Sequence, residues 1–344
     1  MPIPAMPDTV MPTAATPATT FPAATMPATT FPTAAMPTEP ADDTFAKALQ
    51  VLLAAHCPPA VVRAVERGDS DVPGQVLWKV LDDSGFANAM LPESLDGAGL
   101  TLAQAFPLFE LCGRFLVPLP LAETLLVRAW AAARGIDPPT GCEDLDWVKA
   151  AARVMPQGPV PETQPNSQAE NQPDTQAMRA AVLAAQLAGA MQRVLEMTLQ
   201  FANERQQFGR PLGKFQAIQH QLAQMAEHCL AAHMAAQIGC TPMASSPAHR
   251  PGHRHDHLPD RLRAGIAKAR ASEAAVEVAA LAHSIHGAIG FTEAFDLQLF
   301  TRRLHSWRQM AGAESYWHRE IGEALLAAPH GLALDALRQV TDGA

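Results

Sequence analysis

Arg205 is the residue of this 344-residue chain whose surroundings most clearly suggest chemistry. A segment of helical apolar periodicity, from about 177 to 203, runs into it, and Gly209 and Pro211 are suited to end one helix and begin the next. A guanidinium at a helix end can bind a phosphate, and a nearby glycine lets that group approach the backbone. The alternative is a solvated arginine at the corner of a helical hairpin, and these residues alone leave both interpretations open.

A second group of potential ligands lies between 249 and 257. Imidazole and carboxylate groups coordinate metal ions, and four histidines and one aspartate fall within these nine residues. Arginine, proline and glycine are interspersed among them, which favours a solvated loop, so we predict no functional metal site. The five residues are His249, His253, His255, Asp256 and His257.

The composition predicts a mostly helical protein in a reducing compartment. Hydrophobic residues make up 48% of the chain, charged residues make up 17%, and alanine-rich windows dominate. A net charge of −9 without a block of Lys or Arg argues against nucleic-acid binding. No apolar run approaches the roughly 18–20 residues of a membrane span. Five scattered cysteines indicate free thiols, so we expect a cytoplasmic location.

Periodicity divides the chain into five regions with an all-α fold class. We predict a disordered Pro/Ala/Thr/Met-rich tail over 1–42 and an N-terminal helical domain over 43–135. Residues 136–176 form a short, partly Pro-rich middle segment, and 177–328 contain four helix-length segments that predict a four-helix bundle. Residues 329–344 form a C-terminal tail.

Two blocks in the predicted bundle resemble a known family. Arg-Gln-Gln-Phe-Gly-Arg-Pro-Leu at 205–212, followed by Phe-Gln-Ala-Ile-Gln at 215–219, resembles the opening of the C-terminal helical domain of acyl-CoA dehydrogenases. His-Gly-Ala-Ile-Gly-Phe-Thr-Glu at 286–293 resembles the same domain's glycine-rich turn. The loops at 90–100 and 118–124 resemble the family's N-terminal helical domain, and the chain is identified as a member of this superfamily.

The resemblance implies FAD as a cofactor shared across a subunit interface. In the family, one subunit holds the flavin ring and the neighbouring subunit holds the pyrophosphate and adenosine. This chain matches the second set, with Ala288 where the family usually has a glycine. The implied cofactor-binding residues are Arg205, Phe208, Gln216, Gly287 and Gly290.

The same resemblance implies that the catalytic base is absent. The family removes the substrate's α-proton with the glutamate of a Glu-Gly-Thr-Ser segment, and the matching residues here are Ala311-Gly312-Ala313. Glu314, the nearest alternative, lies close to a helical turn and about 4–5 Å away, whereas proton transfer needs a distance near 3 Å. A second position that carries the base in other members, near 176–181, has no carboxylate. We therefore expect no catalytic residue.

The middle segment is too short for the β-barrel of on the order of 100 residues that the family inserts there, so we expect this domain to be reduced or absent. The leading hypothesis is the non-catalytic subunit of a heteromeric FAD-dependent acyl-CoA dehydrogenase, for fatty acyl or sterol side-chain substrates. A homologous full-length partner, in a heterotetramer, would bind the acyl-CoA. One alternative is a self-sufficient enzyme with an unrecognised base, as a homodimer or homotetramer, and another is a flavin-free interaction protein.

Overall fold

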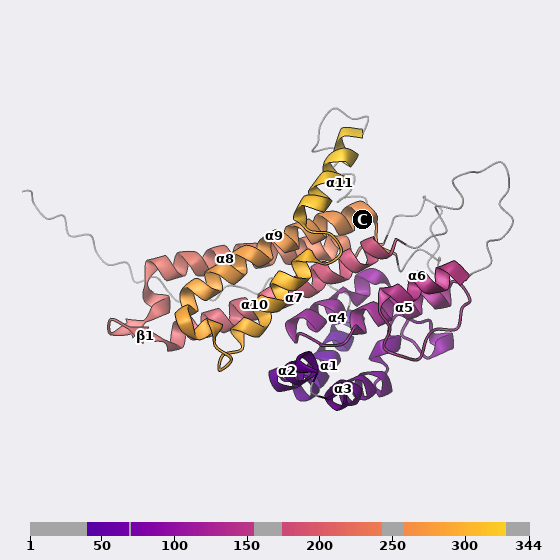
Figure 1. Ribbon diagram of the computed structural model, residues 1–344, viewed down its shortest axis with the longest axis horizontal. Helices are drawn as coiled ribbons and strands as arrows, with labels where there is room; N and C mark the ends of the chain where they lie inside the picture. Colours follow the sequence, from indigo (N-terminus) through magenta and orange to yellow (C-terminus); the bar gives the residue numbers. More distant parts are fainter. Residues whose placement is uncertain (1–39, 69, 155–173, 243–257, 328–344) are drawn as a thin grey trace, which may run out of the picture. The chain divides into compact units, whose positions relative to one another are not determined.

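Helices make up nearly all of the regular structure in the computed structural model (Figure 1). The structure describes residues 40–68, 70–154, 174–242 and 258–327. Most of the predicted N-terminal tail, the C-terminal tail and the His-rich segment 249–257 lie outside the described residues. The predicted all-α fold class is confirmed.

Five helices and two short 3-10 turns precede the middle segment. Pro58 and Pro59 separate the first two helices, because a proline at the first helical position has no N–H to donate. The fourth helix begins with a capping box, in which Thr101 and Gln104 each bind the other's backbone N–H. The elements are α1 (Pro40–His56), α2 (Pro59–Arg67), α3 (Val72–Asp83), η1 (Phe86–Asn88), η2 (Glu93–Leu95), α4 (Leu102–Arg114) and α5 (Leu121–Ala133).

In the described part of the middle segment, where we expected the family's barrel to be reduced or absent, the regular structure is a short helix, α6 (Leu145–Val154). Its Trp147 meets Trp130 of α5 edge to face, with ring centroids 6.5 Å apart. The approach to α6 is fixed by α5, since the Thr124 hydroxyl donates to the Glu143 carbonyl at 2.8 Å and Arg128 donates to the Thr140 carbonyl at 2.8 Å. Within the described ranges the only strands are two-residue ones, which confirms that the middle β-domain is largely missing.

The C-terminal region is the predicted four-helix bundle, with its fourth helix broken into two. α9 lies against α7, α8, α10 and α11, and the facing surfaces of α7 and α9 are rich in buried alanine, which lets these helices pack closely. The elements are α7 (Thr175–Glu204), β1 (Gln206–Gln207), β2 (Arg210–Pro211), η3 (Leu212–Lys214), α8 (Gln216–Gly239), α9 (Arg261–His286), η4 (Gly287–Phe291), α10 (Leu297–Gln309) and α11 (Glu314–Ala327).

The segment Arg261–Phe291, formed by α9 and η4, has the length and hydropathy of a membrane span, as does the bent pair α1–α2. Core helices of globular proteins share these properties. α9 packs against four other helices and carries a fully buried lysine, Lys268. These contacts favour a core helix rather than a membrane span for Arg261–Phe291.

The N-terminal helices contact the bundle mainly through α4 and α7, whose backbones touch. A Cβ at Gly113 would lie 1.9 Å from the Gln186 carbonyl oxygen, and a Cβ at Gly189 would lie 1.9 Å from the Glu110 carbonyl oxygen. Glycine is therefore required on both helices. The described residues from Pro40 to Ala327 belong to one compact unit, so the boundaries drawn between helical domains stay predictions.

Candidate cofactor half-site

Arg205 ends α7 and opens a small β-hairpin rather than the direct helix-to-helix corner that the sequence suggested. Its N–H donates to the Phe201 carbonyl at 2.8 Å, and its own carbonyl accepts from the Leu212 N–H at 2.8 Å. Gln207 pairs with Arg210, which leaves Phe208 and Gly209 as a two-residue loop with φ of 52° and 79°. Two positive φ values define the tight hairpin turn, and the Phe-Gly pair was its only sequence signal.

The backbone of Phe208 adopts an unfavourable conformation in this turn, and its side chain points into solvent. Its side chain is 91% exposed, and a left-handed conformation costs a non-glycine residue about 1–2 kcal/mol. Its ring meets Phe215 at 6.1 Å, and the Arg210 guanidinium lies over the Phe215 ring at 4.1 Å. The hairpin therefore presents a large aromatic surface that none of the residues described in the structure covers. Gln216, the first residue of α8, is also exposed.

The glycine turn η4 caps the far end of α9. Gly287 has φ 65° and ψ −147°, and no atom lies within 4 Å of where a Cβ would stand, so its backbone is open to approach. Gly290 is buried, and a Cβ there would lie 3.0–3.2 Å from Leu297, His286 and His283. The turn is thus folded tightly onto two histidines, while Gly287 faces outward.

The structure brings the hairpin and the glycine turn to the same end of the bundle. The Phe201 ring, one turn before Arg205, stacks on the His286 ring with centroids 4.3 Å apart. Gln221 of α8 donates to the Ser284 hydroxyl of α9 at 3.2 Å. The segments that carry the five predicted cofactor residues therefore lie on adjoining elements, although those residues are far apart in the sequence.

The residues present fit the pyrophosphate end of a dinucleotide. Within the part of the chain that the structure describes, Arg205 is exposed and its guanidinium makes no hydrogen bond or ion pair. A free guanidinium and an open glycine backbone are the groups that bind phosphate oxygens. That these residues bind FAD remains a prediction.

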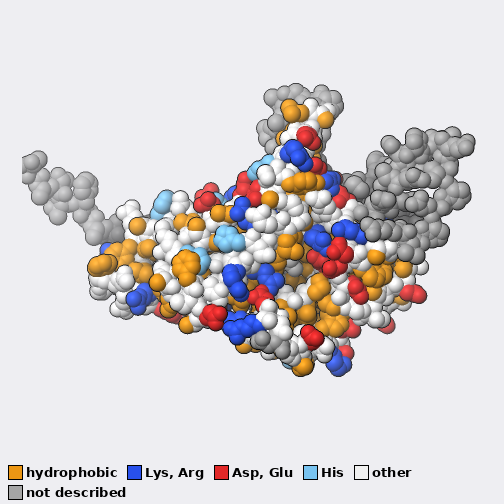
Figure 2. Space-filling view, viewed as in Figure 1, with side chains coloured by type: hydrophobic (Ala, Val, Ile, Leu, Met, Phe, Trp, Pro, Cys, Tyr) orange, Lys and Arg blue, Asp and Glu red, His pale blue; other side chains and the backbone are white. Residues whose placement is uncertain are grey.

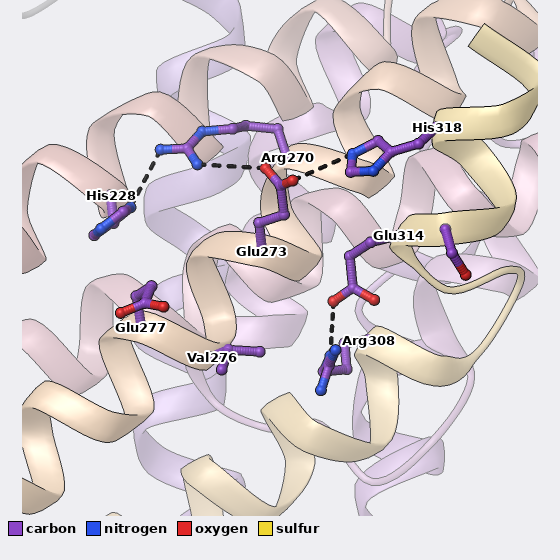
Figure 3. Close-up of a pocket in the computed structure, with 9 residues that line it drawn as sticks. His228, Arg270, Glu273, Val276, Glu277, Arg308, Glu314 and His318 are labelled. Atoms are coloured by element: carbon purple, nitrogen blue, oxygen red, sulfur yellow. Dashed lines mark hydrogen bonds and ion pairs between the residues drawn. The ribbon is translucent and has the colours of Figure 1, made fainter. Parts of the chain in front are cut away.

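The loop Met310–Ala313 between α10 and α11 contains the expected base position. Ala311 has φ 55°, and its methyl group cannot accept a proton. Glu314 begins α11, and its carboxylate accepts from Arg308 Nε at 2.7 Å (Figure 3). Burial raises the pKa of Glu314, but the Arg308 hydrogen bond and the charges of Arg308 and Lys268 outweigh it and leave that pKa lowered. A carboxylate stabilised as its anion is a poor base.

Lys268 of α9 fixes this loop, and sequence reasoning missed it. The side chain is fully buried, and its Nζ donates to Ser272 Oγ at 2.7 Å and to the carbonyls of Arg308 and Gly312 at 2.9 and 3.2 Å. A cation among the last carbonyls of α10 complements that helix's dipole. Burial nevertheless lowers the pKa of Lys268 to about 8. The only sequence signal was a lysine within an alanine-rich helix.

A pocket of about 640 Å³ lies beside this loop and is lined almost entirely by charged and polar side chains of α8 to α11 (Figure 3). Arg270 lies 3.2 Å from His228, and Glu273 lies 3.2 Å from His318. An acyl chain needs a predominantly apolar lining, so this pocket does not suit one. Among the described residues no cluster of His, Cys, Asp or Glu has the arrangement of a metal site.

Comparison with known proteins agrees with this architecture. Residues 175–326 match the family model of the acyl-CoA dehydrogenase C-terminal domain. Acyl-CoA dehydrogenase IpdE2 of Mycobacterium tuberculosis is 30% identical over 303 residues, which cover 75% of this chain and 89% of that protein.

Two solved structures share the fold at lower identity. The ChsE4-ChsE5 complex from Mycobacterium tuberculosis has a TM-score of 0.64 and 18% identity, covering 86% of this chain and 99% of that one. The Tcur3481-Tcur3483 steroid ACAD has a TM-score of 0.63 and 22% identity, covering 83% and 98%. The fold is the helical one of acyl-CoA dehydrogenases with the middle β-domain largely missing, and the chain belongs to the acyl-CoA dehydrogenase superfamily, whose general cofactor is FAD.

Proposed function

We propose that this chain is the non-catalytic subunit of a heteromeric, FAD-dependent acyl-CoA dehydrogenase that forms the α,β-double bond of an acyl-CoA thioester. The observation that carries the proposal is the contrast between the two ends of the bundle. Among the described residues, the end with Arg205 and Gly287 has a guanidinium without a partner and an open glycine backbone, whereas the loop at Ala311 offers no base. This contrast supports the proposal that the chain contributes one half of a cofactor site without the chemistry that the other half supplies.

In this proposal each residue of the half-site has a binding role. Arg205 holds the pyrophosphate through paired hydrogen bonds, and Gly287 and Gly290 let the backbone of the turn reach it. Phe208 and Gln216 contact the remaining part of the nucleotide. FAD, when bound, accepts the hydride from the substrate's β-carbon. The partner, a full-length homologue, supplies the base, the middle domain and the acyl-CoA site.

The names of similar proteins support a heteromer. ChsE4-ChsE5 and Tcur3481-Tcur3483 are each named as a pair, and the second is called a steroid ACAD. On this analogy the assembly is a cytoplasmic heterotetramer, and its substrate is a bulky acyl-CoA such as one with a sterol side chain.

The rival hypothesis is a self-sufficient enzyme in which Glu314 is the base. Its carboxylate is bound by Arg308 and faces the charged pocket, which argues against this role. A flavin-free interaction protein is the third hypothesis. This hypothesis gives no ligand to the exposed Phe208, which is held in a left-handed conformation, or to the open backbone of Gly287.

Purification with and without a full-length homologous subunit separates the three hypotheses. We expect the chain alone to be colourless and the co-purified complex to carry flavin and oxidise an acyl-CoA in the presence of an electron acceptor. A yellow, active protein obtained from this chain alone would support the self-sufficient enzyme. A colourless complex would support the interaction protein.

A further inference from the structure

We infer that His286 is a positioning residue that sets the spacing between Arg205 and the glycine turn, and that its protonation releases the turn. The inference deepens the proposed function, because the two elements that it joins are the two parts of the proposed half-site. Neither the sequence motifs nor the comparisons assign His286 a role.

The contacts of His286 form a continuous path between the two elements. The backbone N–H of Arg205 donates a hydrogen bond to the Phe201 carbonyl, and the Phe201 ring stacks on the His286 imidazole at an interplanar angle of 25°. His286 directly precedes Gly287, and its Cβ would lie 3.1 Å from a Cβ at Gly290. Phe295, just past the turn, closes the other side of the ring at 5.0 Å. A change in this one ring therefore moves both parts of the half-site.

The hydrogen bonds of His286 define its neutral tautomer. Nδ1 lies 2.8 Å from the Ala282 carbonyl, which can only accept, so Nδ1 carries the proton. Nε2 is then an acceptor, and it is buried with no hydrogen-bond partner among the described residues. The residue is only 5% exposed. Protonation would place an N–H and a positive charge at Nε2 where nothing accepts them.

The charged groups of the surrounding elements do not compensate for that charge. On α9 itself, His283 adds a second imidazole, and its charge further lowers the pKa of His286, which burial already depresses. α10 offers Asp296, but this carboxylate is paired with Arg63 of α2 at 2.5 Å. α7 ends in Glu204 and Arg205, of opposite sign, and α8 contributes the neutral Gln221.

His283 supports the same turn from its other side and responds to acid in the same direction. Its ring stacks on the exposed Phe291 with centroids 4.0 Å apart, its Nε2 lies 2.9 Å from Thr301 Oγ1, and its Nδ1 is buried without a hydrogen bond. Burial and the charge of His305 on α10 lower its pKa. An opened turn exposes both rings and binds protons more readily, so acid favours the open turn.

The test is hydrogen–deuterium exchange of residues 284–296 in the full chain at pH 7.5 and 5.5, corrected for the intrinsic exchange rate. His286→Phe keeps the stacked ring without a titrating group. His286→Gln keeps a donor for Ala282 but has neither ring nor charge. His56→Phe, at the exposed end of α1, is the control.

We expect wild type and His56→Phe to lose about tenfold in protection on acidification, because an exposed imidazole with the ordinary pKa of about 6.5 changes from mostly neutral to mostly protonated between the two pH values. We expect His286→Phe to be protected at pH 7.5 and to lose clearly less protection in acid than wild type, with the remaining loss due to His283. We expect His286→Gln to be poorly protected already at pH 7.5, with an equally reduced loss in acid. Equal acid dependence in wild type and both His286 variants would overturn the inference. Flavin retention by the co-purified complex is measured in parallel: greater acid release of flavin in wild type than in His286→Phe supports coupling to the half-site. If Arg205→Ala leaves flavin retention unchanged while the hydrogen–deuterium exchange of wild type and the His286 variants is as expected, the proposed function is wrong but the inference of a proton-sensitive turn is still supported.

Discussion

Replacing Gly189 with alanine tests the contact between α4 and α7 directly. The new Cβ would stand 1.9 Å from the Glu110 carbonyl oxygen, 2.8 Å from its carbon and 3.0 Å from the Arg114 nitrogen. These are backbone atoms, so a rotamer change cannot relieve the clash, and the helices must separate by an ångström or more. Overpacking of this kind costs about 1–3 kcal/mol and sometimes more. Separation also weakens dispersion contacts along the whole interface.

The better helix propensity of alanine offsets about 1 kcal/mol, and a clash with backbone atoms falls at the upper end of the overpacking range, so we expect Gly189→Ala to lower the free energy of unfolding by about 2 kcal/mol. The matched control is Gly322→Ala in α11, where no atom lies within 4 Å of the new Cβ. This change should be neutral or stabilise by up to about 1 kcal/mol. Urea denaturation of both variants and wild type gives the values. A Gly189→Ala protein as stable as Gly322→Ala would show that the two backbones do not touch.

Two further predictions concern the loop beside the expected base position. Glu314→Gln should leave the kcat of an active complex nearly unchanged, because Arg308 binds that carboxylate; a fall of about 10³ or more would identify Glu314 as an essential base. Lys268 has a pKa lowered to about 8 by burial, so the folded chain releases this proton before the unfolded chain does. Its contribution to the free energy of unfolding should therefore rise by about 1 kcal/mol per pH unit from pH 8 to about 10. Denaturation of Lys268→Met across the same range should lack this rise, and parallel curves would refute the assignment.

Much of the fold followed from local patterns. Apolar spacing located α7, turn residues located the interruption around Gly209, and the family resemblance located the glycine turn at Gly287. The short middle segment correctly predicted that a barrel would be missing. In each case the information lay within a few residues of the element concerned, or in a simple count of chain length.

The features that sequence reasoning missed depend on contacts between distant residues. Lys268 caps a helix end 40 residues away, and nothing near it in sequence indicates that partner. His286 is positioned by stacking on Phe201, which lies 85 residues earlier, whereas the neighbouring sequence indicates only one more residue of a helix. Within their own helices, Gly113 and Gly189 would only lower helix stability. The requirement for glycine at both positions becomes apparent only from the packing of α4 against α7. The hairpin after Arg205 was missed because a phenylalanine is unusual at a positive φ.

The charged surface around α2 and α10 has a simpler explanation than a binding site. Figure 2 shows acidic and basic side chains together over this part of the molecule. Arg63 pairs with Asp296, Arg67 with Glu293, and Glu66 with Arg302. These pairs join α2 to the segment that follows η4, and exposed pairs of this type contribute about 0–1 kcal/mol each.

Flavin retention by the co-purified complex at limiting FAD, with wild type compared to Arg205→Ala, tests the central claim most directly. The account predicts FAD binding weaker by about ten- to a hundredfold, because a charge-assisted pair is worth about 1.5–3 kcal/mol. Arg205→Lys should restore it only in part, since an ammonium lacks the two-pronged geometry. Arg319→Ala, which removes an exposed arginine of α11, should behave as wild type. Equal flavin content in Arg205→Ala and wild type, with the complex intact by size-exclusion chromatography, would contradict the half-site.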